Sequence, residues 1–139
     1  MAAKTNNMDV LGSLAIFSGL SKGEMKHIAG EAREEFYSAG QDIVTEGQSG
    51  GPFFVVTEGR VDILQGDKKI GEQGPGSAFG ERALFEGGHR TATVRAQTQV
   101  KALAIASWNF LEILQDNWEI TKKILSEMSR RLSELEGTH

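Results

Sequence analysis

The spacing of apolar residues divides the chain into three zones. Residues 8–32 and the part from Ser107 onward have the spacing of amphipathic helices, whereas the stretch from about Glu34 to Ala106 alternates short apolar runs with glycines. The runs of the middle zone are rich in β-branched and aromatic residues: Asp42–Glu46, Phe53–Glu58, Arg60–Gln65, Thr91–Ala96 and Lys101–Ala106. Twelve of the chain's 17 glycines lie in this zone. Short strands separated by glycine turns predict a β-sandwich, a jelly roll or a small barrel.

The two helical zones carry their own start signals. Ser21 and Glu24 form a capping box, in which each side chain bonds a backbone N–H that the helix leaves unpaired. We expect Ser107 to be the N-cap of one C-terminal helix, and a second helix to run from about residue 117 to 136. One apolar stripe of that second helix comprises Leu125, Met128, Leu132 and Leu135. The stripe suits packing on the β-zone, closure over a ligand, or pairing with a second subunit.

Composition narrows the class of protein. The 139 residues suit one domain, which we place at residues 8–136. A net charge of −4 disfavours a nucleic-acid binder, although one positive pocket suffices for a small anion. The lack of cysteine excludes disulfides and thiolate metal sites, and no apolar run has membrane-spanning length or precedes an export-type cleavage pattern. We therefore expect a cytoplasmic protein. The aromatic residues expected in its core are Phe17, Phe36, Phe53, Phe54, Phe79 and Trp108.

Residues 79–96 hold the candidate chemistry. A short helix beginning near Glu81 would aim its free N–H groups at an anion, and Gly80 would let a ligand approach the backbone. A glycine pair before Arg90 would turn the chain, so that a guanidinium suited to phosphate oxygens returns to the same place. The Glu81 carboxylate repels phosphate but accepts from a sugar hydroxyl. Together, these groups predict a sugar-phosphate site.

Each of these charged residues also has a plainer structural explanation. Arg90 could form a surface salt bridge with Glu86, and Glu81 could be only a first-turn acid favoured by the helix dipole. The strand-like sequence that begins at Arg90 argues against a surface salt bridge. The pairing of Glu81 with Arg90 argues against a role of Glu81 as a first-turn acid alone. Arg82 and His89 are expected to be solvent-exposed.

The same residues resemble the phosphate-binding cassette of cyclic-nucleotide-binding domains, the family of the catabolite activator protein, protein kinase A regulatory subunits and cyclic-nucleotide-gated channels. That cassette has the pattern F-G-E-x-A-L, a short variable stretch, and R-[A/S/T]-A-T-V. This chain has FGERAL at residues 79–84 and RTATV at residues 90–94, with the same spacing between acid and arginine. Residues 16–21, 39–47 and 54–61 resemble further segments of the family in the same order. The resemblance covers nearly the whole chain.

The resemblance implies a mainly β fold with flanking helices. This is a jelly-roll-like β-roll (double-stranded β-helix) with N-terminal helices, a short phosphate-binding helix and two C-terminal helices. It implies that Glu81 binds the ribose 2′-hydroxyl, that Arg90 and the Ala83 N–H bind the cyclic phosphate, and that Thr91 lies beside the phosphate and base. The ligand-binding set that it implies is Phe79, Gly80, Glu81, Arg82, Ala83, Arg90, Thr91 and Ala92. Candidates for a lid over the base are Arg131, Leu132 and Leu135.

Three hypotheses about function remain. The favoured one is a non-enzymatic sensor that binds cAMP rather than cGMP, although Thr91 permits both. Binding would move the C-terminal helices, which would act on an effector protein. A homodimer through the last helix is a further option. A degenerate module that binds no nucleotide is the alternative. A cupin-like metal enzyme would need a ligand cluster, which His27, His89 and His139 do not form. No metal or membrane partner is expected, and no nucleic-acid partner is expected because no helix-turn-helix follows the last predicted helix.

Overall fold

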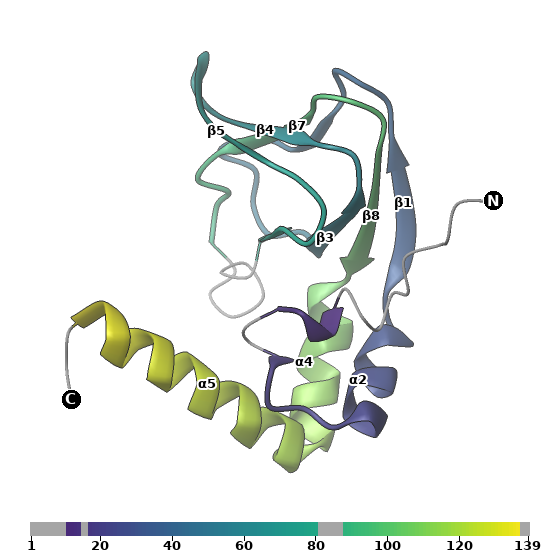
Figure 1. Ribbon diagram of the computed structural model, residues 1–139, viewed down its shortest axis with the longest axis vertical. Coiled ribbons are helices and arrows are strands. Elements are labelled where there is room, and N and C mark those ends of the chain that lie inside the picture. The colour runs from purple at the N-terminus through teal and green to yellow at the C-terminus, as the bar shows by residue number, and fades with distance from the viewer. Residues whose placement is uncertain (1–10, 15–16, 81–87, 137–139) are drawn as a thin grey trace.

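The computed structural model describes residues 11–14, 17–80 and 88–136, with side chains through residue 130 and at residue 133. Figure 1 shows the strands gathered in one body, with helices α2, α4 and α5 at one end of it. In chain order, the elements are α2 (Lys22–Ala29), β1 (Arg33–Tyr37), β2 (Asp42–Val44), β3 (Phe53–Glu58), β4 (Val61–Gln65), β5 (Lys68–Gln73), β6 (Ala78–Phe79), β7 (Thr93–Ala96), β8 (Val100–Ile105), α4 (Ser107–Asp116) and α5 (Trp118–Glu136).

The described strands form two four-stranded sheets, in the orders β1-β8-β3-β6 and β2-β7-β4-β5. Every pairing is antiparallel, and most neighbours in a sheet are distant in the chain: β8 pairs with both β1 and β3, and β7 with both β2 and β4. This arrangement confirms the predicted fold, a mainly β structure of the β-roll type with flanking helices. The predicted short phosphate-binding helix falls on residues 81–87, which lie outside the described residues.

Strand β8 separates two hydrophobic cores. Successive side chains of a strand point to opposite faces of its sheet. Leu103 and Ile105 accordingly lie in an outer core with the helices, while Ala102 and Ala104 lie in an inner core between the sheets. All six residues of β8 are buried as a result. The burial of both faces explains why the sequence here is almost continuously apolar.

Helix α2 begins at the predicted capping box. The Glu24 backbone N–H donates to Ser21 Oγ (3.2 Å), and the Ser21 N–H donates to Glu24 Oε1 (2.8 Å). Glu24 also accepts from Lys123 Nζ of α5 at 2.7 Å. The Lys123 hydrogen bond, followed by the bond from the Ser21 backbone, lowers the pKa of Glu24. One carboxylate therefore caps α2 and joins it to α5.

Several sequence predictions about the helices and the core are wrong. Phe36 and Trp108 are each 70% exposed, so neither belongs to the core. Helix α4 has Ala106 as its N-cap with no side-chain hydrogen bond, and the predicted Ser107 cap is absent there. Leu125 of the predicted stripe is 52% exposed, whereas Met128 packs against the outer core, to which Ile120 and Ile124 of α5 also belong. The described part of the predicted stripe is thus divided between the core and the surface, and the side chains of Leu132 and Leu135 lie outside those described.

Candidate functional site

Two loops that are far apart in the sequence pair beside Arg90. The Arg90 N–H donates to the Gln48 carbonyl and the Gly47 N–H donates to the Arg90 carbonyl, both at 2.8 Å. Ser49 and His89 form an isolated antiparallel bridge between the same segments. The chain just before β7 is therefore held in register against the loop that precedes β3. This pairing fixes the backbone from which the Arg90 side chain projects.

The Arg90 side chain turns inward from this backbone. The residue is only 7% exposed, and its Nη2 donates to the Pro52 carbonyl at 2.6 Å. Within the described residues, Nε and Nη1 are buried and have no hydrogen-bond partner. Burial lowers the pKa of the Arg90 guanidinium, but an arginine still carries its positive charge in a protein. A buried cation with free donors on two nitrogens is suited to an anionic ligand.

Two glycines allow the guanidinium to occupy this position. Gly51 has φ +101°, and a Cβ added to it would lie 2.8 Å from Arg90 Nη2. Gly80 has φ +90°, and a Cβ there would overlap Arg90 Nη1 and lie 3.0 Å from the Pro52 carbonyl oxygen. Both glycines are in the left-handed region, which other residues rarely adopt. The guanidinium thus lies against glycine backbone at both positions.

Three other residues of the predicted ligand-binding set are described. Phe79 is half-buried in β6 and stacks on Phe54, with ring centroids 5.3 Å apart. Thr91 is exposed, and its carbonyl accepts from Gln65 Nε2 at 3.3 Å, while Ala92 is half-buried in the bend before β7. The ring stack gives Phe79 a core role, as one of the predictions had it. No contact in the described part of the chain assigns a ligand to Thr91 or Ala92.

The remaining predicted site residues are not described in enough detail to be placed. Glu81, Arg82 and Ala83 lie outside the described residues. Arg131, Leu132 and Leu135 lie in helix α5, but their side chains are not among those described. The predicted ribose contact and the predicted lid therefore stay predictions. His89 is exposed, as expected.

The sequence interpretation missed Gly51 and Pro52 as residues of this site. Pro52 supplies the carbonyl that accepts from Arg90, across a separation of 38 residues. The local signal was the Gly-Gly-Pro run at residues 50–52, which indicates a turn of unusual backbone geometry. Nothing in that run indicates that an arginine would pack on it.

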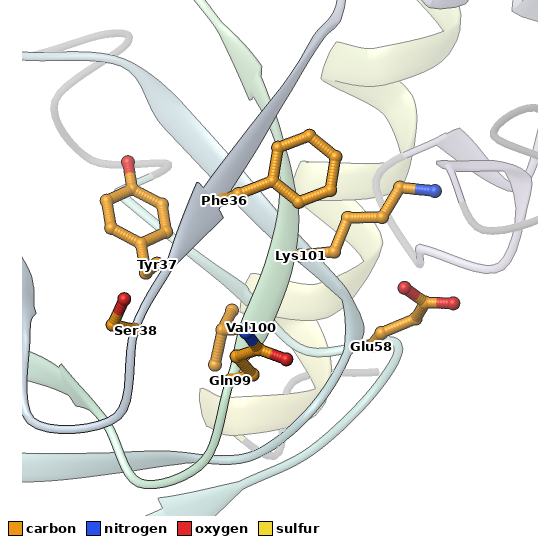
Figure 2. Close-up of a pocket in the computed structure, with 7 residues that line it drawn as sticks. All are labelled: Phe36, Tyr37, Ser38, Glu58, Gln99, Val100 and Lys101. Carbon is orange, nitrogen blue, oxygen red and sulfur yellow. The ribbon is translucent and has the colours of Figure 1, made fainter.

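A separate cavity of about 410 Å³ lies at the ends of β1, β3 and β8 (Figure 2). Its lining residues are Phe36, Tyr37, Ser38, Glu58, Gln99, Val100 and Lys101. Lys101 is buried and paired with Glu34, with Nζ and Oε1 3.3 Å apart. The cavity includes no residue of the predicted site, and its buried cation already has a carboxylate partner. Lys101 thus differs from Arg90, for which no ion pair is found among the described residues.

Two classes of site receive no support from the described residues. No group of three or more histidine, cysteine or acidic residues among them could hold a metal ion. In the part of the chain that the structure describes, no helix is both long enough and apolar enough to cross a bilayer.

Comparison with known proteins places this site in a known domain. The family model for the cyclic nucleotide-binding domain matches residues 34–117, which run from the second residue of β1 through the end of α4 and include Arg90. The match covers more than half of the chain. The chain belongs to the cyclic nucleotide-binding domain family. The members of this family bind cAMP or cGMP as a ligand, and the family resemblance predicted from the sequence is confirmed.

Curated relatives of this family member are much longer proteins. The cAMP-dependent protein kinase regulatory subunit of Eremothecium gossypii is 33% identical over 104 residues, which are 75% of this chain and 23% of the relative. A cyclic nucleotide-gated potassium channel of Rhizobium etli is 31% identical over 118 residues, which are 85% of this chain and 33% of the channel. The chain thus spans between about a quarter and a third of these relatives.

Solved structures of cyclic nucleotide-binding proteins and regulators share the fold. The N-terminal domain of a transcriptional regulator from Streptomyces coelicolor A3(2) superposes with a TM-score of 0.85 at 30% identity, over 93% of this chain and 94% of that one. The catabolite activator protein of Thermus thermophilus has a TM-score of 0.73 at 24% identity, over 88% of this chain and 60% of that one. At that identity, the second comparison supports the fold alone.

Proposed function

We propose that this chain binds a cyclic nucleotide, cAMP in preference to cGMP, and acts as a non-enzymatic sensor module. The observation that supports the site is the buried Arg90 guanidinium, whose Nε and Nη1 have no partner within the described part of the chain. A cyclic phosphate carries one negative charge and two free oxygens, so it can both neutralise the guanidinium and accept from those nitrogens. The name of the cAMP-dependent relative supports the choice of cAMP.

The other ligand contacts of the proposal come from the family resemblance. Glu81 accepts from the ribose 2′-hydroxyl, and the Gly80 and Ala83 backbones contact the sugar-phosphate. Thr91 lies beside the phosphate and the base. Arg131, Leu132 and Leu135 of α5 are the proposed lid. A carboxylate for the hydroxyl and a guanidinium for the phosphate would hold opposite sides of one cyclised ribose phosphate.

The experiment that tests the proposal is a calorimetric titration of wild type and Arg90→Ala with cAMP and with cGMP. Charged hydrogen bonds are worth about 1.5–3 kcal/mol each, so we expect Arg90→Ala to lose several kcal/mol of binding free energy. Arg95→Ala is the matched control. Arg95 lies five residues after Arg90, its side chain is exposed, and its Nε donates to Asp42 Oδ1 at 2.6 Å. Equal affinities for wild type and Arg90→Ala would overturn the site.

The ribose contact is tested separately. Wild type should bind cAMP more tightly than 2′-deoxy-cAMP, and Glu81→Ala should reduce that difference, because the ribose 2′-hydroxyl would have lost its carboxylate acceptor. If wild type binds both nucleotides equally, Glu81 has a different role.

We further propose that binding is coupled to movement of α4 and α5. Pro52, which accepts from Arg90, precedes Phe53 of β3. The Phe53 ring lies edge-on to Phe17 (6.3 Å between centroids), and Phe17 in turn packs on Phe110 of α4 (5.9 Å). Ile120 and Ile124 of α5 belong to the same core. A ligand that shifts Arg90 would thus act on a packed cluster that includes both helices, to the extent that it binds one arrangement more tightly.

The moving helices also offer a surface for an effector protein or a second subunit. Trp118 and Leu125 of α5 are 66% and 52% exposed and lie seven residues apart, so both occupy the same face of the helix. We propose that residues 8–136 fold as one domain that presents this face. Sedimentation of wild type and Leu125→Glu would test the homodimer, since a charge in that seam should dissociate it.

A further inference from the structure

We propose that Gly51 and Pro52 position the Arg90 guanidinium and thereby determine the affinity of the site for the phosphate. The inference rests on the proposed function and deepens it. It gives a role in the site to two residues that precede the 79–92 stretch, in which the ligand-binding residues were predicted. Gly51 leaves room for the guanidinium because it has no Cβ, and Pro52 accepts a hydrogen bond through its backbone carbonyl. Neither residue needs to touch the nucleotide.

The Pro52 carbonyl orients the guanidinium. It accepts from Arg90 Nη2 at 2.6 Å, and it is the side chain's hydrogen-bond acceptor within the described residues. A proline ring holds φ near −65°, and the next residue, Phe53, is fully buried and paired with Ile105 of β8. The acceptor therefore belongs to a rigid part of the backbone. Fixing Nη2 in this way also fixes the directions of Nε and Nη1, because the guanidinium is planar.

Gly51 keeps the guanidinium in this place. The three heavy atoms nearest to a Cβ added at Gly51 all belong to Arg90, at 2.8 Å (Nη2), 3.8 Å (Cζ) and 3.8 Å (Nε). A methyl group here must therefore displace the arginine side chain. Retreat toward Gly80 is blocked, because Nη1 already occupies the space that a Cβ of Gly80 would need. Displacement should break the Nη2 bond to Pro52 and misdirect the free donors.

The acceptor is also electrically neutral, which affects ligand binding. No ion pair involves Arg90 among the described residues, in contrast to Arg95, which pairs with Asp42. A carboxylate in the place of the Pro52 carbonyl would offset the guanidinium charge before a ligand arrives. A carbonyl directs the side chain but leaves its net charge available to a phosphate.

The test compares Gly51→Ala with Gly40→Ala. The two glycines have similar φ values, +101° and +90°, but a Cβ at Gly40 would meet nothing within 4 Å. Both variants carry the backbone strain of a positive φ, so both should melt at a lower temperature. Only Gly51→Ala should bind cAMP more weakly, by roughly tenfold or more, the worth of one charged hydrogen bond. If Gly51→Ala unfolds, Gly51→Asn replaces it, because asparagine tolerates positive φ better and still carries a Cβ.

Two further measurements separate positioning from a general loss of structure. In the Arg90→Lys background, which has no Nη2, Gly51→Ala should cost little further cAMP affinity. In NMR spectra without nucleotide, the Nε–H signal of Arg90 (assigned by its loss in Arg90→Lys) should shift in Gly51→Ala and stay in place in Gly40→Ala.

The outcomes distinguish this inference from the proposed function. Equal cAMP affinities for Gly51→Ala and Gly40→Ala, an undiminished cost in the Arg90→Lys background, or an unshifted Nε–H signal would each overturn the positioning role. A wild-type protein that binds neither cAMP nor cGMP would overturn the proposed function, and the Nε–H signal would still test how Arg90 is held.

Discussion

Replacing Arg90 by methionine should stabilise the unliganded protein while abolishing nucleotide binding. The residue is 7% exposed, and Nε and Nη1 have no partner within the described residues. Methionine keeps much of the buried aliphatic length and has no N–H groups to desolvate. The substitution thus removes the free-energy cost of burying unpaired N–H groups. It also removes the side chain proposed to bind the phosphate.

The magnitude follows from the hydrogen bonds of the side chain. Two unpaired buried nitrogens cost about 1–3 kcal/mol each, or about 4 kcal/mol together at the middle of that range. Against this, Arg90→Met loses the Nη2 bond to Pro52, and a hydrogen bond to a charged group is worth about 2 kcal/mol. The free energy of unfolding of Arg90→Met should therefore exceed that of wild type by about 2 kcal/mol without ligand.

Urea denaturation followed by far-ultraviolet circular dichroism, with and without cAMP, measures both effects. A ligand at about 1,000 times its dissociation constant adds about 4.1 kcal/mol to the free energy of unfolding of a protein that binds it. Wild type should gain this amount and overtake Arg90→Met, whose midpoint should not move. The order of the two midpoints should thus reverse on adding cAMP. If Arg90→Met is less stable than wild type without ligand, the buried nitrogens are satisfied in solution and the reasoning fails.

Three further predictions concern the fold around the site. Phe110→Ala should lower the free energy of unfolding by about 3–5 kcal/mol, because Phe110 is fully buried, whereas Trp108→Ala on the same helix should change it by under about 0.5 kcal/mol; urea titrations of both variants check this. Gly59→Ala should lower the melting temperature more than Gly47→Ala at a similar φ, because its Cβ would overlap the Gln99 carbonyl oxygen while that of Gly47 meets open space. The pKa of Glu24 in the folded state lies below its ordinary value of 4.5. The ionised carboxylate therefore stabilises the fold at a pH above the unfolded-state pKa. This stabilisation is lost as the pH falls through the folded-state pKa. Glu24→Gln should accordingly lower the urea midpoint at about pH 7 and have little effect at about pH 3.

The four inner strands, β3, β4, β7 and β8, all overlap predicted runs, whereas β2 alone among the four edge strands does so. The run Phe53–Glu58 coincides with β3, which pairs on both sides. No predicted run corresponds to β1, β5 or β6, and all three are edge strands. An edge strand has solvent beside it, so REEFY and KKIGEQ carry many charged residues and little apolar periodicity. Burial on both faces produces the apolar runs by which strands are recognised.

The residue types of the candidate site were evident from the sequence, but their arrangement was not. The spacing of glycine and arginine at residues 80 and 90 predicted an anion site, and the Ser21–Glu24 capping box is present as predicted. Both signals are local, because they depend on residues within about ten positions of each other.

The tertiary structure alone decided what surrounds Arg90. Loop pairing across the chain brings Pro52 to the guanidinium from 38 residues away, with Gly51 against the same nitrogen, Nη2. Packing likewise decided that Phe36 and Trp108 are exposed, since an aromatic side chain is buried only where another element covers its face. Local sequence determines which conformations a segment prefers, whereas contacts between distant segments depend on how the two sheets close on each other, and no short stretch of sequence carries that information.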